Sequence, residues 1–173
     1  MRETSGNNKS KQFLIWGILL LVVVVVVFSF LNRNQDNLQE GQLLIKAGDT
    51  QLALLTIADL QQLPAVEKKM VITSSLGRSE HRFTCTELRE VLDSIDPGLT
   101  SQYTRIITRG IDNYTSGLEM SEVLQPDNVH IAYADGGNPL KTKTGKEGSM
   151  RIIIAGDEFG QRFTNFLVSM ELE

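Results

Sequence analysis

The hydrophobic positions of this chain form one long uninterrupted run near the start, followed by short segments separated by polar residues. Residues 13–31 read FLIWGILLLVVVVVVFSFL and hold no charged side chain over 19 positions. At about 1.5 Å of rise per residue, a helix of this length just crosses a hydrocarbon core of about 30 Å. The pattern therefore predicts one transmembrane helix over 13–31, since a helix is the form in which a single segment satisfies its own backbone in lipid.

A cleavable signal peptide is the alternative explanation of this run. The apolar region of such a peptide spans about 7–15 residues and is followed by a cleavage site of the small-x-small type. Here the run is longer, and residues 28–32 (FSFLN) offer no such site. We therefore favour an uncleaved, single-pass anchor that contacts the lipid bilayer through residues 13–31.

Charges on either side of the run predict its orientation. Lys9 and Lys11 lie just before it, whereas Arg33 after it is offset by Asp36. Because basic residues are enriched on the cytoplasmic side, residues 1–12 are expected to be a cytoplasmic tail, with the remainder of the chain extracytoplasmic. This design is typical of a bacterial cell-membrane protein.

The remaining pattern is that of one folded domain. Residues 32–50 are polar and are interpreted as a juxtamembrane linker, with the apolar patch 43–45 (LLI) as a candidate first strand at its end. Residues 51–173 are numerous enough to bury a core. Helical spacing and turn signals predict helices over 56–63, over 86–95 and from near Ser121, and strands over 69–74, 81–84, 103–108, 128–133, 150–155 and 163–172. Helices and strands that alternate in this way indicate an α+β fold with a mixed sheet and short helices.

Three positions carry more specific expectations. Residues 150–155 (MRIIIA) are apolar on both faces and are predicted to form a central strand. His130 alternates with Val129 and Ile131, which predicts a place on the polar face of a strand, and His81 is expected in a solvated turn. Cys85 lies where a strand meets an amphipathic helix. It is interpreted as a small, partly buried residue rather than as a thiolate held at the helix N-terminus.

Charge and composition exclude several classes of function. Lys and Arg number 17 against 21 Asp and Glu, and the net charge of −4 divides into +2 for residues 1–12 and −6 for the rest. An acidic folded part argues against nucleic acid as a partner. One Cys excludes an intramolecular disulfide framework, and two His separated by 49 positions provide no metal-ligand spacing, so no metal ligand is predicted. Phosphate-cradling glycine loops and G-x-S-x-G elbows are missing from the sequence.

Five segments occur in an order that belongs to one known family. They are TIADLQQLP, RFTCTELREVLDSI, RIITRGIDNYTSGLEMSEVL, VHIAYADGGNPL and SMRIIIAGDEFGQRFTNFLVSMELE. Together they resemble the molybdopterin-binding domain of the sulfite-oxidase-like oxidoreductases, in a short stand-alone form that covers residues 52–173. The resemblance implies a sulfite-oxidase-like molybdopterin-binding fold for residues 51–173.

The departures from the family pattern bear on function. In the enzymes of the family, a Cys before the "f-t-G-v" motif supplies a thiolate to molybdenum, and a soft thiolate suits such a metal. The matching region, ITSSLGRSEHRF, holds Ser74 and Ser75 but no Cys, and Cys85 stands where the family has Gly. Asn113 also replaces a frequent Gly. No catalytic residue is therefore assigned, and no cofactor is expected, although the resemblance alone would imply molybdopterin.

Three functions stay open at this point. The first is a non-catalytic module that binds a small-molecule ligand or a membrane-protein partner through the cleft of the family fold. The second is a molybdopterin-dependent oxidoreductase with an atypical metal ligand such as Ser75. The third is an accessory subunit of a membrane complex, with contacts made by the Val-rich anchor and the patch 43–45.

Candidate cleft residues follow from the loops after predicted strands, where a rigid sheet presents side chains to a ligand. An anion would be met by Arg109, and hydrogen bonds would be placed by Asp112 and Tyr114. The alternative for these three is ordinary turn chemistry, or burial in the core for the tyrosine. The complete set of candidates is Ser74, Ser75, Arg78, Arg109, Asp112 and Tyr114.

Overall fold

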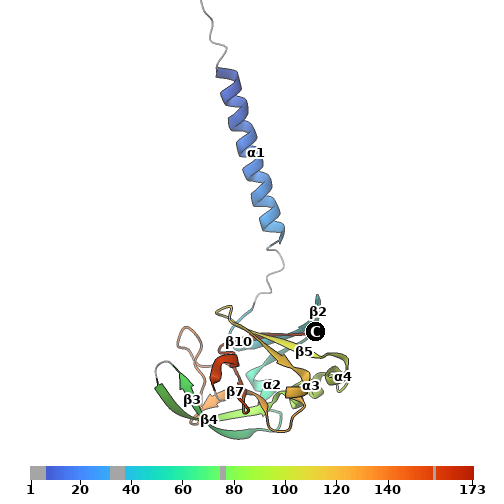
Figure 1. The fold of residues 1–173 in the computed structure, drawn as a ribbon, viewed down its shortest axis with the longest axis vertical. Coiled ribbons are helices and arrows are strands. Elements are labelled where there is room, and N and C mark those ends of the chain that lie inside the picture. The colour runs from blue at the N-terminus through green and yellow to red at the C-terminus, as the bar shows by residue number, and fades with distance from the viewer. Residues whose placement is uncertain (1–6, 32–37, 75–76, 158) are drawn as a thin grey trace, which may run out of the picture. The chain divides into compact units, whose positions relative to one another are not determined.

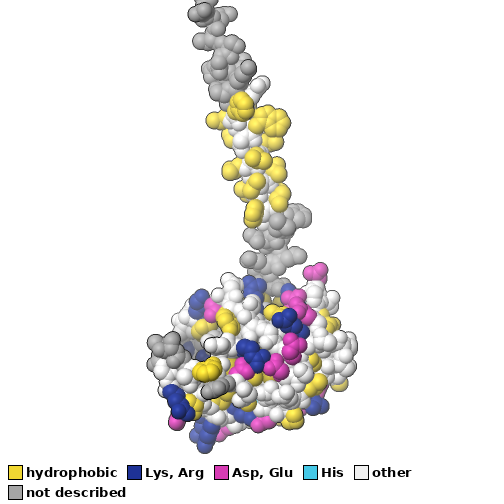
Figure 2. Space-filling view, in the orientation of Figure 1, with side chains coloured by type: hydrophobic (Ala, Val, Ile, Leu, Met, Phe, Trp, Pro, Cys, Tyr) yellow, Lys and Arg dark blue, Asp and Glu magenta, His cyan; other side chains and the backbone are white. Residues whose placement is uncertain are grey.

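The computed structural model describes residues 7–31, 38–74, 77–157 and 159–173, and it divides into two units, Met1–Asn37 and Leu38–Glu173. The first unit contains the helix α1 (Asn7–Leu31), 25 residues long. Its segment Lys11–Phe28 is long and apolar enough to cross a membrane, and the side chains of that segment are exposed on all sides (Figure 2). This segment lies near the N-terminus, and none of it is buried.

The second unit contains two β-sheets and short helices (Figure 1). The first sheet has the order β2-β1-β10-β5-β6, and the second has the order β3-β4-β7-β8, with β9 also paired to β7. The strands of the first sheet are β1 (Gln42–Ala47), β2 (Thr50–Thr56), β5 (Arg105–Gly110), β6 (Thr115–Glu119) and β10 (Leu167–Leu172). Those of the second are β3 (Val66–Ser74), β4 (Gly77–Glu87), β7 (Val129–Asp135), β8 (Asn138–Pro139) and β9 (Arg151–Ile154).

The first sheet is mixed because β1 and β10 run parallel, with Leu44 opposite Ser169, while its other pairs are antiparallel. This pairing makes residues 42–47 part of the folded core rather than of a linker. The patch 43–45, expected above as a contact surface for a membrane complex, is buried in this sheet. That expectation is wrong, because the side chains of Leu43, Leu44 and Ile45 are all buried within the folded unit and leave no apolar surface for a partner.

Five short helical segments belong to the described part of this unit. They are α2 (Ile57–Leu60), α3 (Leu88–Ile95), α4 (Leu99–Gln102), α5 (Met120–Val123) and the 3-10 turn η2 (Gly160–Arg162). Two of them, α2 and α5, begin with a capping box. Thr56 caps α2 in a capping box with Asp59, and α2 is shorter than the helix predicted over 56–63. In α3, Leu88, Val91 and Leu92 face the core at helical spacing.

Strand β9 differs from its predicted central position. It pairs with β7 alone within the second sheet, so it is not central by strand order. Its other side is covered by the segment after η2, where the Ile152 N–H donates to the Thr164 carbonyl at 3.0 Å. The apolar sequence of residues 150–155 therefore predicted burial correctly, but it did not predict the position of the strand in the sheet. A covering loop excludes water from a strand as well as a neighbouring strand does.

One contiguous core joins the two sheets and the helices. Its largest fully buried side chains are Phe83, Leu43, Ile45, Leu60, Leu88, Leu92, Ile106, Leu118, Ile131, Met150, Ile152 and Ile153. Figure 1 shows the long β3–β4 hairpin at one side of the folded unit and α3 and α4 at the opposite side. On the face shown in Figure 2, Lys and Arg side chains lie beside Asp and Glu rather than in a patch of one sign. The core fixes the hairpin on which the candidate site is built.

Candidate functional site

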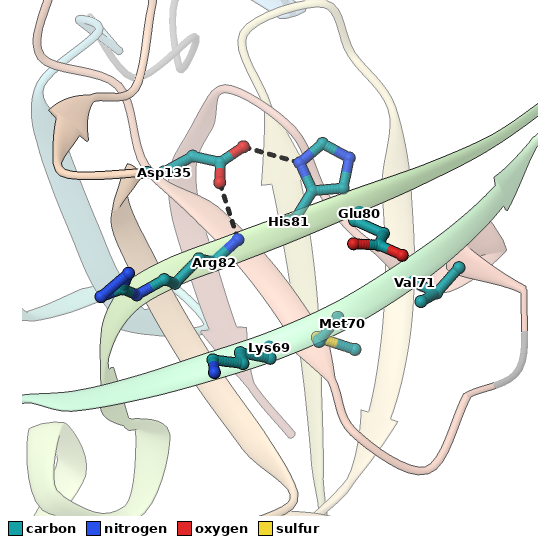
Figure 3. Close-up of a pocket in the computed structure, with 8 residues that line it drawn as sticks. Lys69, Met70, Val71, Glu80, His81, Arg82 and Asp135 are labelled. Atoms are coloured by element: carbon teal, nitrogen blue, oxygen red, sulfur yellow. Dashed lines mark hydrogen bonds and ion pairs between the residues drawn. The ribbon is translucent and has the colours of Figure 1, made fainter.

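A cleft of about 450 Å³ lies where the β3–β4 hairpin meets the end of β7 (Figure 3). Its lining residues are Lys69, Met70, Val71, Glu80, His81, Arg82, Asp135 and Gly136. A volume of this size suits a small ligand, and the mixture of apolar and ionisable side chains suits a polar one.

A hydrogen-bonded relay of three side chains borders this cleft. The Nδ1 atom of His81 lies 2.6 Å from Oδ2 of Asp135, and its Nε2 atom lies 2.8 Å from the hydroxyl of Ser79. Two-residue alternation places Ser79, His81 and Phe83 on one side of β4, and the β4–β7 register sets Asp135 opposite Phe83. The relay is therefore a direct product of strand register.

Asp135 is held by two donors. Its second carboxylate oxygen, Oδ1, accepts the Arg82 N–H at 3.0 Å, so each oxygen has its own hydrogen bond (Figure 3). Burial opposes ionisation of this carboxyl, but the bonds from His81 and Arg82 outweigh burial and lower its pKa. Asp135 is thus a carboxylate at neutral pH and fixes the orientation of the imidazole.

The aromatic ring beneath His81 completes the support. The rings of His81 and Phe83 stack with centroids 5.1 Å apart at an interplanar angle of 4°, and Phe83 is fully buried. The Arg151 guanidinium lies 5.6 Å from the centre of the same ring. Burial lowers the pKa of Arg151, while the Asp135 charge acts in the opposite sense. The site therefore contains a rigid imidazole between a carboxylate and a hydroxyl, above a packed base.

The order Ser–His–Asp is that of hydrolase triads, which also need N–H donors aimed at a developing oxyanion. The contacts described for Ser79 are its bond to His81 and its pairing with Ile72 on β3. These contacts orient a hydroxyl and an imidazole, and they present donors and acceptors to a bound molecule.

The structure divides the candidate residues named from the sequence between the two sheets. Arg78 is exposed on β4 and lines a second cleft of about 530 Å³ together with Lys68, Thr73 and Asp157. Ser74 ends β3 and its side chain lies outside the described part of the chain, as does the whole of Ser75.

The other three candidates lie at the β5–β6 turn of the first sheet. Arg109 donates to the side chain of Asn113 at 2.6 Å, and Asp112 accepts the Tyr114 N–H at 3.1 Å. The Tyr114 hydroxyl donates to the Gln161 carbonyl. None of the three lines either of the two described clefts, so the structure does not bring them together with Arg78. Their bonds are those of a turn, in which Asn113 adopts a positive φ of 66°.

Sequence reasoning missed His81 and Asp135 and misplaced His130. His81 lies in β4 rather than in a solvated turn, because that strand begins at Gly77. His130 is fully buried rather than on a polar face, because β7 is covered on both sides over residues 129–133. Asp135 directly precedes Gly136 and Gly137, and this turn signal was the one indication in the sequence that Asp135 lies at the end of a strand.

The cysteine is inaccessible. Cys85 is fully buried in β4, and its thiol donates to the Val66 carbonyl at 3.5 Å. Burial raises the pKa of the thiol to about 12, so it stays protonated at neutral pH. The interpretation of Cys85 as a buried structural residue is confirmed, although it lies within a strand rather than beside a helix end.

Comparison with solved structures identifies the fold. No protein-family model matches the sequence, and no curated protein matches it either. The sulfane dehydrogenase SoxCD from Paracoccus pantotrophus matches in structure with a TM-score of 0.62 at 14% identity, over 79% of this chain and 39% of that chain. This chain therefore spans well under half the length of the protein it matches. The protein has a sulfite-oxidase-like α+β fold, preceded in the chain by one apolar helix.

Proposed function

We propose that this protein is a membrane-anchored, extracytoplasmic module that uses a sulfite-oxidase-like fold to bind a small polar ligand or a membrane-protein partner without molybdenum chemistry. The observation that carries the proposal is the state of Cys85. It is the single Cys of the chain, and it is buried and protonated. Molybdopterin is the cofactor that the fold implies, but the residues present supply no thiolate to molybdenum.

The cleft beside the relay supports ligand binding in place of redox chemistry. Lys69 and Glu80 reach it from neighbouring strands and carry opposite charges, while His81 offers a fixed imidazole. A ligand with both an anionic and a hydrogen-bonding group matches this lining. The anchoring part of the proposal is supported by the length and exposed apolar surface of α1.

The first experiment purifies the full chain in detergent from the membranes of cells supplied with molybdate. We expect the protein to stay in the membrane fraction after alkaline extraction and to contain molybdenum far below one atom per chain, with no pterin fluorescence released on denaturation. A metal content near one per chain would show that a ligand other than a Cys thiolate is used, and would overturn the non-catalytic proposal. Release by alkali would overturn the anchor.

Sidedness is tested by cysteine labelling, for which the buried native thiol gives a low background. In intact cells, a membrane-impermeant maleimide should label the Gln39→Cys variant, whose position is exposed in the folded unit, and should not label Arg2→Cys. Both variants should react after lysis. The opposite pattern in intact cells would place the folded unit in the cytoplasm.

A further inference from the structure

A buried imidazole lies at the other end of β7 from the relay. His130 is fully buried, and neither of its ring nitrogens has a hydrogen-bond partner among the described residues. Buried polar atoms in native proteins are almost always bonded, and an exception calls for an explanation such as a bound ion or water. His130 does not line the cleft beside His81 and Asp135.

Two carboxylates lie next to this imidazole. The β4–β7 register sets Glu87 directly opposite His130, and Asp127 belongs to the turn that leads into β7. One ligand atom from each of the three residues lies within 4.8 Å of the other two. We propose that Glu87, Asp127 and His130 form a binding site for one Zn²⁺ ion.

The separation between His130 and Asp127 agrees with zinc coordination. Zinc binds His nitrogen and carboxylate oxygen at about 2.0–2.2 Å in a tetrahedral arrangement, which sets two of its ligands about 3.4 Å apart. The Nε2 atom of His130 lies 3.4 Å from Oδ1 of Asp127. The Asp127 side chain is 64% exposed and Glu87 is half-buried, so neither is fixed by core packing, although Asp127 is paired with Lys68.

The state of His130 suits a metal ligand. The ring is fully buried, and burial disfavours the charged form of an imidazole. A neutral imidazole keeps a lone pair on one nitrogen, which is the form that binds metal. One nitrogen and two carboxylates leave a fourth position for water.

Lys68 provides a directional test of the site. Its ammonium pairs with the Oδ2 atom of Asp127, and it also donates to the Asp127 carbonyl at 3.4 Å. A dication on Oδ1 would compete with this ammonium for the same carboxylate. Removal of the Lys68 charge should therefore tighten zinc binding, whereas a merely structural role of Asp127 predicts no such gain.

The experiment titrates the chelator-treated full chain in detergent with zinc chloride by calorimetry. We expect one saturable site, at least a tenfold weaker affinity in Asp127→Asn and in Glu87→Gln, and an affinity several-fold tighter in Lys68→Met. Two control variants should bind zinc with the affinity of the wild type. The first is Glu90→Gln, an exposed change on α3, and the second is His81→Asn, which removes the other His–carboxylate pair.

A cobalt ion in place of zinc provides a second, spectroscopic measurement that is independent of calorimetry. Substitution of Co²⁺ should give visible absorption bands of a four-coordinate site, and these bands should be lost in Asp127→Asn. No saturable binding, equal affinity in the two carboxylate variants and the wild type, or loss of binding only in His81→Asn would each overturn the proposal. Circular dichroism of every variant distinguishes loss of the site from loss of the fold.

Discussion

Replacement of Phe83 by alanine is expected to lower the free energy of unfolding by about 3–5 kcal/mol, the usual cost of deleting a fully buried aromatic side chain. Phe83 has no exposed surface, stacks on His81 and lies under the Arg151 guanidinium. The variant therefore loses apolar burial and also the base on which the ligand-site imidazole rests. Urea unfolding of the full chain in detergent, followed by near-ultraviolet circular dichroism, measures the change.

Phe159 provides the matched control for this variant. Phe159 is 50% exposed, so Phe159→Ala should cost about half as much as Phe83→Ala, in proportion to the apolar area that it buries. A cost below about 1 kcal/mol for Phe83→Ala would contradict the close packing of Phe83 described above. Deletion of a fully buried phenyl ring leaves a cavity, and the residues around that cavity lose their contacts.

Replacement of Arg162 by methionine is expected to cost about 2 kcal/mol, less than the 3–5 kcal/mol of a fully buried pair because its side chain is 38% exposed. Arg162 donates to both carboxylate oxygens of Glu122 at 2.8 and 3.0 Å, and it donates to Asp157 at 2.9 Å. The variant leaves these two carboxylates close together without a cation. Arg89→Met, which removes an exposed pair with Asp93, should cost only about 0.3–0.5 kcal/mol.

The cost at Arg162 should depend on pH in a defined direction. The hydrogen bonds from Arg162 lower the pKa of Glu122 below its ordinary value of 4.5. A carboxyl with a lowered folded-state pKa contributes stability that is complete above the ordinary value and is lost as the pH falls through the lowered one. The difference between wild type and Arg162→Met should therefore be constant near neutral pH and shrink below about pH 4.5. A difference that stays constant down to pH 2 would show that the ion pair contributes little.

Local signals in the sequence were sufficient for the elements with strong periodicity. The capping box at Thr56 and the spacing of Leu88, Val91 and Leu92 predicted α2 and α3, although α3 starts two residues later than expected. The delay arises because Thr86 and Glu87 pair with β7, and ladder hydrogen bonds to a neighbouring strand override helix propensity. The order of five motifs was enough to indicate the sulfite-oxidase-like fold.

The candidate site was much less accessible from sequence. Its imidazole and its carboxylate, His81 and Asp135, are 54 positions apart, and only the β4–β7 register brings them to 2.6 Å. The cluster of Glu87, Asp127 and His130 depends on the same register. Local spacing predicts which side of a strand a residue occupies, but it carries no information about the residue opposite.

The sequence by itself determined the properties that depend on neighbouring residues: the long apolar helix near the N-terminus, the apolar spacing of α3, the acidic balance and the lack of a cysteine in the segment that would supply the molybdenum ligand. The tertiary structure alone decided the parallel pairing of β1 with β10, the burial of His130 and the protonated state of Cys85. The physical reason is that periodicity and capping are local interactions along the chain. Strand register and the desolvation of a side chain are instead set by segments far apart in sequence, which only the folded chain brings together.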